Sequence, residues 1–236
     1  MRITRSKWLV ALLMTTPALA MAQQEQNTIS DDVQTQPGQH YGRLNTVSGN
    51  VHVAHGAQVG NVHSVSGDIT VEAGAKIGNA GTTSGHLSVA QDCQTGRLTD
   101  VSGNIALGRK VVVDGGLTLV SGNLFADHGS RIEGDVNLVS GELGLVQTEV
   151  DGNIAFVSGD VTIGAGSHVS GRLYLKKPSY VSTPRVPRVV IGPNAVVDGP
   201  LNFERPVTLY VHSSAKVGPI TGATPIAFST TQAPKG

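Results

Sequence analysis

Apolar residues recur along this chain with a fixed period that differs from the spacing of a helix. The tetrad VSGN, VSGD or a close variant begins at positions 47, 65, 83, 101, 120, 139 and 157. It therefore recurs at intervals of ~18 positions, and two of the intervals are one position longer. Within a period, an apolar residue recurs every six positions, as at Val47, Val53, Val59, Val65 and Val71. No ten-residue window has a helical period, while Gly is frequent and Val dominates. The pattern predicts three short strands per period, separated by corners.

Three sides per period predict an all-β fold, a single-stranded triangular β-solenoid (β-helix) with coils of ~18 residues. About nine coils, stacked ~4.8 Å apart with Val over Val in the interior, would form a rod ~40 Å long. We expect regular coils over residues 44–173, a Pro-rich basic loop over 174–190, and final coils with a cap over 191–222. Residues 23–43 are expected to be a flexible polar linker, and 223–236 a loose tail. Where an interval is longer, we expect the extra residue at a corner, because a slip within a strand would turn buried side chains outward.

Residues 1–22 have a different pattern. Arg2, Arg5 and Lys7 precede an apolar run over 8–14 and a small-residue cleavage site over 18–22, which is typical of a secretory signal peptide. We therefore expect export to the periplasm, with the cell surface or secretion as alternatives. No later segment approaches the ~20 apolar residues of a membrane span. Without these three residues, the 17 basic residues fall to 14 against 17 acidic ones, which argues against a nucleic-acid partner.

Some stretches resemble known families of β-helix proteins. GSRIEGDV from Gly129, GSHVSGRL from Gly166 and NAVVDGPL from Asn194 resemble the coil motif of bactofilins, bacterial proteins that polymerise end to end. The VSGD and VSGN tetrads are similar to an exported adhesin-like β-helix family. The resemblance covers about residues 45–220 and implies right-handed winding. It also implies either a homo-oligomer or end-to-end polymer, or a module that binds a cell-envelope polymer or protein. ITVEAGAKIGNAG from Ile69 is similar to hexapeptide-repeat acyltransferases, so left-handed winding and acyl transfer remain alternatives.

The tetrads stack into a column that is the most visible candidate site. Its last position could bind cations along the series Asn50, Asp68, His86, Asn104, Asn123, Glu142 and Asp160. We favour a structural interpretation, in which Gly adopts a backbone conformation closed to other residues and Ser and Asn or Asp satisfy a tight corner. The structural turn column then comprises Ser48, Gly49, Ser66, Gly67, Ser102, Gly103, Ser121, Gly122, Ser140, Gly141, Ser158 and Gly159, with Ser84 and Gly85 in the TSGH copy.

The Pro-rich loop is the one segment that the repeat does not require. It carries four basic residues that we predict to bind an acidic polymer or a protein partner: Lys176, Lys177, Arg185 and Arg188. Such a loop could equally be a solvated crossover between coils.

Enzymatic and metal chemistry have weaker support in the sequence. His52 alternates with Val51 and Val53 and should face solvent, and the other His residues lie on coils too far apart to share an ion. Corner carboxylates without aromatic platforms argue against a glycan-cleaving enzyme. Cys93 occupies a position that is small in other coils, so we expect a buried, inert thiol. We therefore predict a non-enzymatic exported scaffold with no catalytic residue, metal or cofactor.

Overall fold

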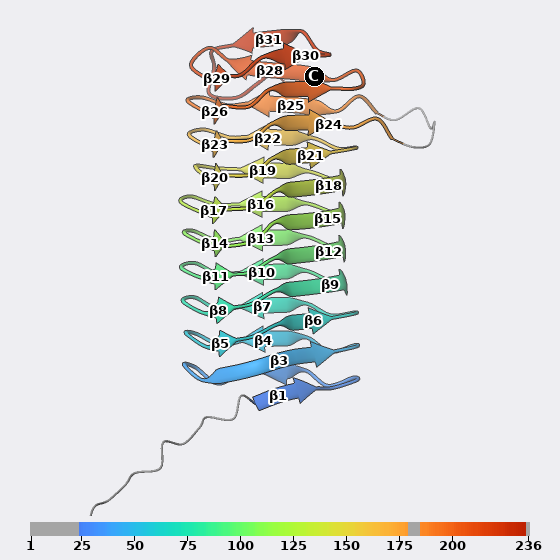
Figure 1. The fold of residues 1–236 in the computed structure, drawn as a ribbon, viewed down its shortest axis with the longest axis vertical. Helices are drawn as coiled ribbons and strands as arrows, with labels where there is room; N and C mark the ends of the chain where they lie inside the picture. The colour runs from blue at the N-terminus through green and yellow to red at the C-terminus, as the bar shows by residue number, and fades with distance from the viewer. Residues whose placement is uncertain (1–23, 179–184, 235–236) are drawn as a thin grey trace, which may run out of the picture.

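The computed structural model describes residues 24–178 and 185–234, which form one β-solenoid whose coils stack along a single axis (Figure 1). All regular elements of the described residues are strands. One wall holds 11 strands, one per coil, so the rod has more coils than the nine expected. The predicted signal peptide lies outside the described residues. The β-solenoid fold predicted from the period is confirmed.

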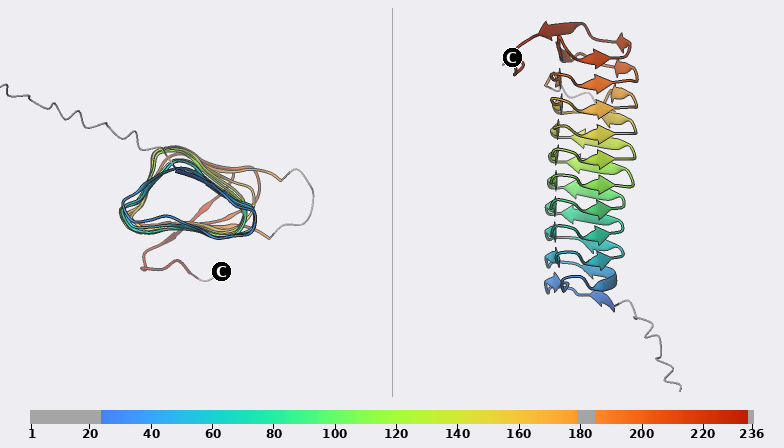
Figure 2. Two further views of the ribbon diagram at one scale, coloured as in Figure 1. Left: turned by 90° about the horizontal axis from the view of Figure 1, so that it is seen from below. Right: turned by 90° about the vertical axis from the view of Figure 1, so that its left-hand side faces the viewer.

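Three walls enclose the core, as the view along the axis in Figure 2 shows. Wall 1 is the 11-stranded sheet: β2 (Val33–Gln34), β4 (Val51–Val53), β7 (Ile69–Val71), β10 (Leu87–Val89), β13 (Ile105–Leu107), β16 (Leu124–Ala126), β19 (Leu143–Leu145), β22 (Val161–Ile163), β25 (Arg188–Ile191), β28 (Thr208–His212) and β31 (Pro225–Phe228). Wall 2 consists of two-residue strands: β5 (Gln58–Val59), β8 (Lys76–Ile77), β11 (Gln94–Thr95), β14 (Val112–Val113), β17 (Arg131–Ile132), β20 (Glu149–Val150), β23 (His168–Val169), β26 (Val196–Val197) and β29 (Lys216–Val217). Wall 3 holds β1 (Gln24–Asn27), β3 (His40–Thr46), β6 (Val62–Ser64), β9 (Ala80–Ser84), β12 (Leu98–Ser102), β15 (Leu117–Ser121), β18 (Val136–Ser140), β21 (Ile154–Phe156), β24 (Leu173–Leu175), β27 (Leu201–Phe203) and β30 (Ile220–Thr221).

Strands of successive coils pair in parallel and in register, so equivalent residues form files along the axis. Leu87 pairs with Ile69 in the coil before and with Ile105 in the coil after. The longer period is absorbed at the corner between walls 2 and 3, because Thr95 pairs with Val113, 18 positions later, whereas Leu98 pairs with Leu117, 19 positions later. The predicted placement of the extra residue at a corner is therefore confirmed.

The core is one continuous column of mostly aliphatic side chains, with inward and outward residues alternating along each strand. The corner between walls 1 and 2 places one residue inside, and this residue is small in most coils, although Val111 and Thr148 are buried at the same position. The series Ala57, Ala75, Cys93, Ser130 and Ser167 is buried, as predicted from the repeat. Burial raises the pKa of the Cys93 thiol above its ordinary value, which keeps it protonated and unreactive at neutral pH.

The valine that opens each tetrad does not lie where the six-residue series placed it. Val47, Val65, Val101 and Val139 are 36–46 % exposed, although we expected them to stack in the interior. The buried residue of this part of wall 3 is the one just before the tetrad, as with Leu119 and Leu138. Inward and outward side chains alternate along wall 3, so the residue that follows this buried one faces outward.

Three predicted boundaries also differ from the structure. Residues 24–43, expected as a linker, form a coil, because Val33 pairs with Val51 and is buried without any tetrad to mark it. The Pro-rich loop is shorter than predicted, since β24 continues to Leu175 and β25 begins at Arg188. The expected loose tail contains β31, which pairs with β28.

The glycine of each tetrad allows successive coils to approach closely. A Cβ built on Gly122 would lie 1.5 Å from the carbonyl oxygen of Gly103, and one on Gly103 would lie 1.7 Å from that of Gly85. Positive φ values occur here only at Gly122, Gly141 and Gly159. The clash between coils, more than backbone conformation, therefore requires glycine along the whole series.

We predict that Gly122→Ala destabilises the fold by more than about 3 kcal/mol, because the added methyl group would force two coils apart. The measurement is equilibrium denaturation followed by circular dichroism. Gly56→Asn is the matched control, since Gly56 also has a positive φ but no atom lies within 4 Å of its added Cβ. Equal stability of the two variants would contradict the role given to the close approach.

Candidate functional site

The last residue of each tetrad bonds to the next coil instead of closing its own turn. The N–H of Asp68 donates to Oδ1 of Asn50 (3.0 Å), and the N–H of His86 donates to Oδ1 of Asp68 (2.7 Å). The side chains of His86, Asn104, Asn123 and Asp160 accept equivalent bonds from later coils. Six of the seven side chains of this file thus accept a backbone N–H, which satisfies donors that would otherwise be exposed at the corner.

This geometry supports the structural interpretation of the column over cation binding. Both carboxylate oxygens of Asp160 are occupied, one by the N–H of Arg188 (2.9 Å) and one by Nη2 of Arg185 (2.7 Å). In the described part of the chain, no group of three or more His, Cys, Asp or Glu side chains is placed to hold a metal ion. The series Ser48, Ser66, Ser102, Ser121 and Ser140 is exposed on the outside of the same corner.

Histidines and corner acids form isolated pairs on separate coils. His52 is partly exposed, as predicted from its alternation, and its Nε2 lies 2.9 Å from Oε1 of Glu72. His168 and Asp198 form a similar pair on wall 2 at 2.7 Å. Arg131 contacts Glu149 at 2.9 Å and Asp151 at 2.7 Å. Each contact joins neighbouring coils at the surface, so these groups stabilise the stacking of coils. They do not come together around one reacting atom.

The four predicted partner-binding residues separate into two kinds. Lys176 and Lys177 are exposed at the start of the loop, where Nζ of Lys176 lies 5.9 Å from the ring centre of Tyr174. Arg185 and Arg188 instead hold the loop to the rod through Asp160. Arg188 also donates from Nη2 to the carbonyl of Pro234 (3.1 Å) and stacks over Tyr210. The structure therefore gives these two arginines intramolecular partners. Residues 179–184 of the loop lie outside the described residues.

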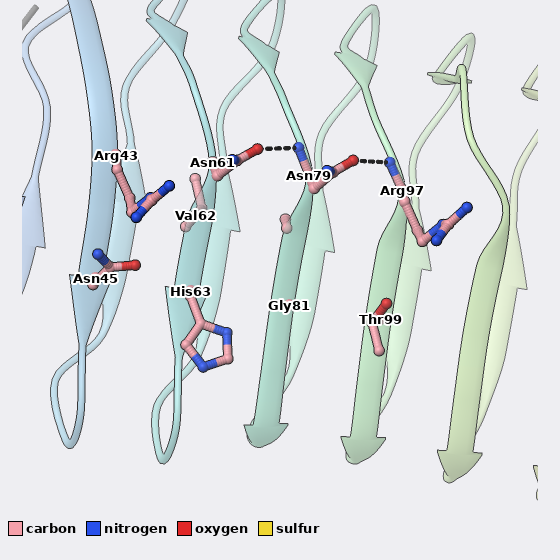
Figure 3. Close-up of a pocket in the computed structure, with 10 residues that line it drawn as sticks. Arg43, Asn45, Asn61, Val62, His63, Asn79, Gly81, Arg97 and Thr99 are labelled. Carbon is pink, nitrogen blue, oxygen red and sulfur yellow. Dashed lines mark hydrogen bonds between the residues drawn. The ribbon is translucent and has the colours of Figure 1, made fainter.

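A shallow, open groove lies on the outer face of wall 3. It has a volume of about 450 Å³ and runs across β3, β6, β9 and β12 (Figure 3). Its side chains come from two files that take one residue from each successive coil, Arg43, Asn61, Asn79 and Arg97 on one side and Asn45, His63, Gly81 and Thr99 on the other. The hollow lies where Gly81 has no side chain between His63 and Thr99.

Sequence reasoning missed this groove, although a signal for it was present. A period identifies residues that repeat from coil to coil. The groove instead depends on a residue that differs from its equivalents, because Gly81 lacks a side chain between His63 and Thr99. Arg43 and Arg97 are far apart in the sequence, and nothing in their local surroundings links them. They are separated by three whole periods, so both fall on the same file of the same wall once the register is known.

A second unforeseen feature is a buried polar file behind the tetrads. Thr46, Ser64, Thr82 and Asp100 are buried at the end of wall 3, where later coils carry Leu119, Leu138 and Phe156. The hydroxyls of Ser64 and Thr82 donate to the carbonyls of Gly49 and Gly67, both at 3.3 Å.

Asp100 fits its buried position less well than Ser64 and Thr82 fit theirs. Its Oδ1 accepts the N–H of Ser102 (3.0 Å), but its Oδ2 is buried without a partner. An ionised carboxylate only accepts hydrogen bonds, so it cannot replace the donated bond of Ser64 or Thr82. Burial accordingly raises the pKa of Asp100 to about 6, against smaller opposing effects of the Ser102 N–H and of His86.

Comparison of the chain with family models, curated proteins and solved structures finds no match. Among the described residues, no helix is long and apolar enough to cross a membrane. Function must therefore be argued from the ends, the walls and the corners of the rod.

We predict that Asp100→Thr raises the free energy of unfolding at pH 8 by up to about 3 kcal/mol, given 1.36 kcal/mol per pKa unit. The folded state holds a proton on Asp100 up to about pH 6, whereas the unfolded chain releases it near its ordinary pKa of 3.8. The contribution of Asp100 to stability is therefore full below pH 3.8 and is lost as the pH rises through 6. Denaturation at several pH values should show this fall in the original chain and a flatter profile in Asp100→Thr. The exposed Asp92→Asn is the control, and an equal gain from both substitutions would refute the assignment.

Proposed function

We propose that this protein is an exported, non-enzymatic scaffold that self-associates through the C-terminal end of its rod. The observation that carries the proposal is the difference between the two ends of the solenoid. Export to the periplasm belongs to the same proposal and rests on the sequence of residues 1–22. The bactofilin-like motifs support it independently, because the family they resemble forms polymers.

The C-terminal end leaves part of the apolar core open. The last full coil has core-facing side chains that are only partly buried: Val207, Val211, Ala215, Val217, Ile220 and Ala223. In the described residues, the terminal strands β29, β30 and β31 each pair only with the equivalent strand of the preceding coil. Their other edges have no strand partner there. Unpaired strand edges beside open apolar side chains favour pairing with another chain.

The end of β31 and the residues after it do not cover this end. Phe228 packs on the outer face of wall 1, against Tyr210 and His212, with ring centres 6.5 and 5.0 Å away. Ala233 and the carbonyl of Pro234 contact the same face through Tyr210 and Arg188. The tail therefore returns along the outside of the rod (Figure 2).

The N-terminal end has a polar cover. The outermost strand at this end, β1, has the sequence QEQN. Its residue Gln26 pairs with Leu44, which faces the core. A second polar residue, Thr35, is buried in the same coil, and its hydroxyl accepts the N–H of Ala54 (2.8 Å). Terminal coils with polar faces protect solenoids from association. Association through the C-terminal end alone would join two copies in a closed, twofold pair.

A second candidate function is an adhesin-like binding module, which the groove on wall 3 favours. A module of this kind would act as a single rod and hold a ligand along its side. The two candidates use different surfaces, so one protein could have both activities.

We predict that the purified protein sediments as a dimer, and that Ala227→Lys converts it to a monomer. Ala227 is exposed on the terminal strand β31, so the added charge repels a second copy without removing a buried contact. Sedimentation velocity over a range of concentrations measures the change.

Val101→Thr is the matched control for association. It removes an exposed apolar side chain from the flank of the rod and introduces the residue that Thr83 supplies in the preceding coil. This variant should remain associated. A monomeric original protein at all concentrations, or an Ala227→Lys variant that associates like the original, would rule out the proposed interface.

A further inference from the structure

We propose that the groove on wall 3 binds a polysaccharide that carries carboxylate groups, with the sugar chain lying along the axis of the rod. This inference rests on the binding-module candidate and names its ligand class. It is independent of association through the C-terminal end.

The groove presents a regular series of polar groups at coil spacing. Arg43 and Arg97 lie at its two ends, three coils apart, or ~14 Å at the ~4.8 Å spacing of paired strands. Between them, Asn61 and Asn79 use Oδ1 to accept the N–H of the next coil, at 3.0 and 2.8 Å. Their Nδ2 groups remain available as donors beside the groove (Figure 3). A linear polymer with a repeating unit fits a site whose own groups repeat along a line.

The charge of the groove is positive and uncompensated. No acidic side chain is among the residues that line it. Within the described residues, neither Arg43 nor Arg97 forms an ion pair, and both side chains are exposed. Arg131 on wall 2 shows the contrast, because Glu149 and Asp151 occupy its guanidinium. Free guanidinium groups bind carboxylates through paired, charge-assisted hydrogen bonds.

The remaining lining groups fit sugar hydroxyls better than a peptide or a nucleic acid. His63, Thr99 and the two asparagine amides supply donors and acceptors, whereas the apolar lining residues Val62 and Ala80 are buried. The lining residues include no Phe, Tyr or Trp ring for stacking of nucleobases, and His63 is their single imidazole. The strands below the groove are paired on both sides, so an extended peptide cannot add to a free edge here.

The first test is isothermal titration calorimetry with polygalacturonate, a linear polymer of uronic acid, at low ionic strength. Dextran serves as the uncharged polymer and poly-glutamate as a carboxylate polymer without sugar rings. We expect binding of polygalacturonate that weakens as salt is added, and no binding of dextran. Equal affinity for poly-glutamate would overturn the assignment to a polysaccharide, and failure to bind polygalacturonate would overturn the site.

Variants locate the binding on the rod. Arg43→Gln combined with Arg97→Gln should lower the affinity at least about tenfold, because both charge-assisted hydrogen bonds to the carboxylates are lost. Gly81→Thr should weaken binding without any change of charge, because it fills the hollow with the residue that Thr99 and Thr118 place on the same file.

The matched control is Arg109→Gln, which removes one exposed positive charge at another corner, where the side chain of Arg109 donates a hydrogen bond to Gln91. It should bind as the original protein does, and all variants should keep the original thermal unfolding profile. An equal loss in Arg109→Gln, or unchanged binding in Gly81→Thr, would show non-specific attraction and refute the groove. Repeating the titration with Ala227→Lys separates this result from self-association.

Discussion

The close approach of successive coils at the tetrad corner is the constraint on which the rest of the structure depends. The carbonyl of one corner glycine occupies the space that a side chain would need on the glycine of the next coil. Glycine at this position lets parallel strands of neighbouring coils pair in register on both sides of the corner. That register aligns core residues into continuous files, as with Ile69, Leu87 and Ile105 on wall 1.

Much of the fold could be predicted because the constraint repeats in the sequence. The period, the position of the extra residue and the small series that includes Cys93 all follow from a requirement that each coil match its neighbours. Predictions failed where the six-residue step disagrees with the alternation of the strand, as at Val47, and where a coil lacks the tetrad, as at residues 24–43. The buried Asp100 could not be predicted either, since its position tolerates Thr, Ser or Leu and so has no fixed residue type.

The candidate sites lie where the structure departs from its repeat. The end of the rod lacks a next coil and leaves the apolar interior partly open. The groove exists because one position of a file is glycine, and because Arg43 and Arg97 flank it on exposed positions that packing does not restrict. The tetrads attract attention in the sequence, yet their side chains are used to join coils. In a protein of this kind, a repeated motif is evidence about stacking, and an irregularity in an outward file is better evidence about binding.

Hydrogen exchange of backbone amides, measured residue by residue, reports whether the tetrad corners hold successive coils together. If the corners join the coils, the amides of Asp68, His86, Asn104 and Asn123 should exchange as slowly as strand amides, although they lie on exposed corners. Protection should decrease in the last coil, where no further coil lies above. Fast exchange at all four amides, as in a solvated ligand-binding loop, would contradict the account.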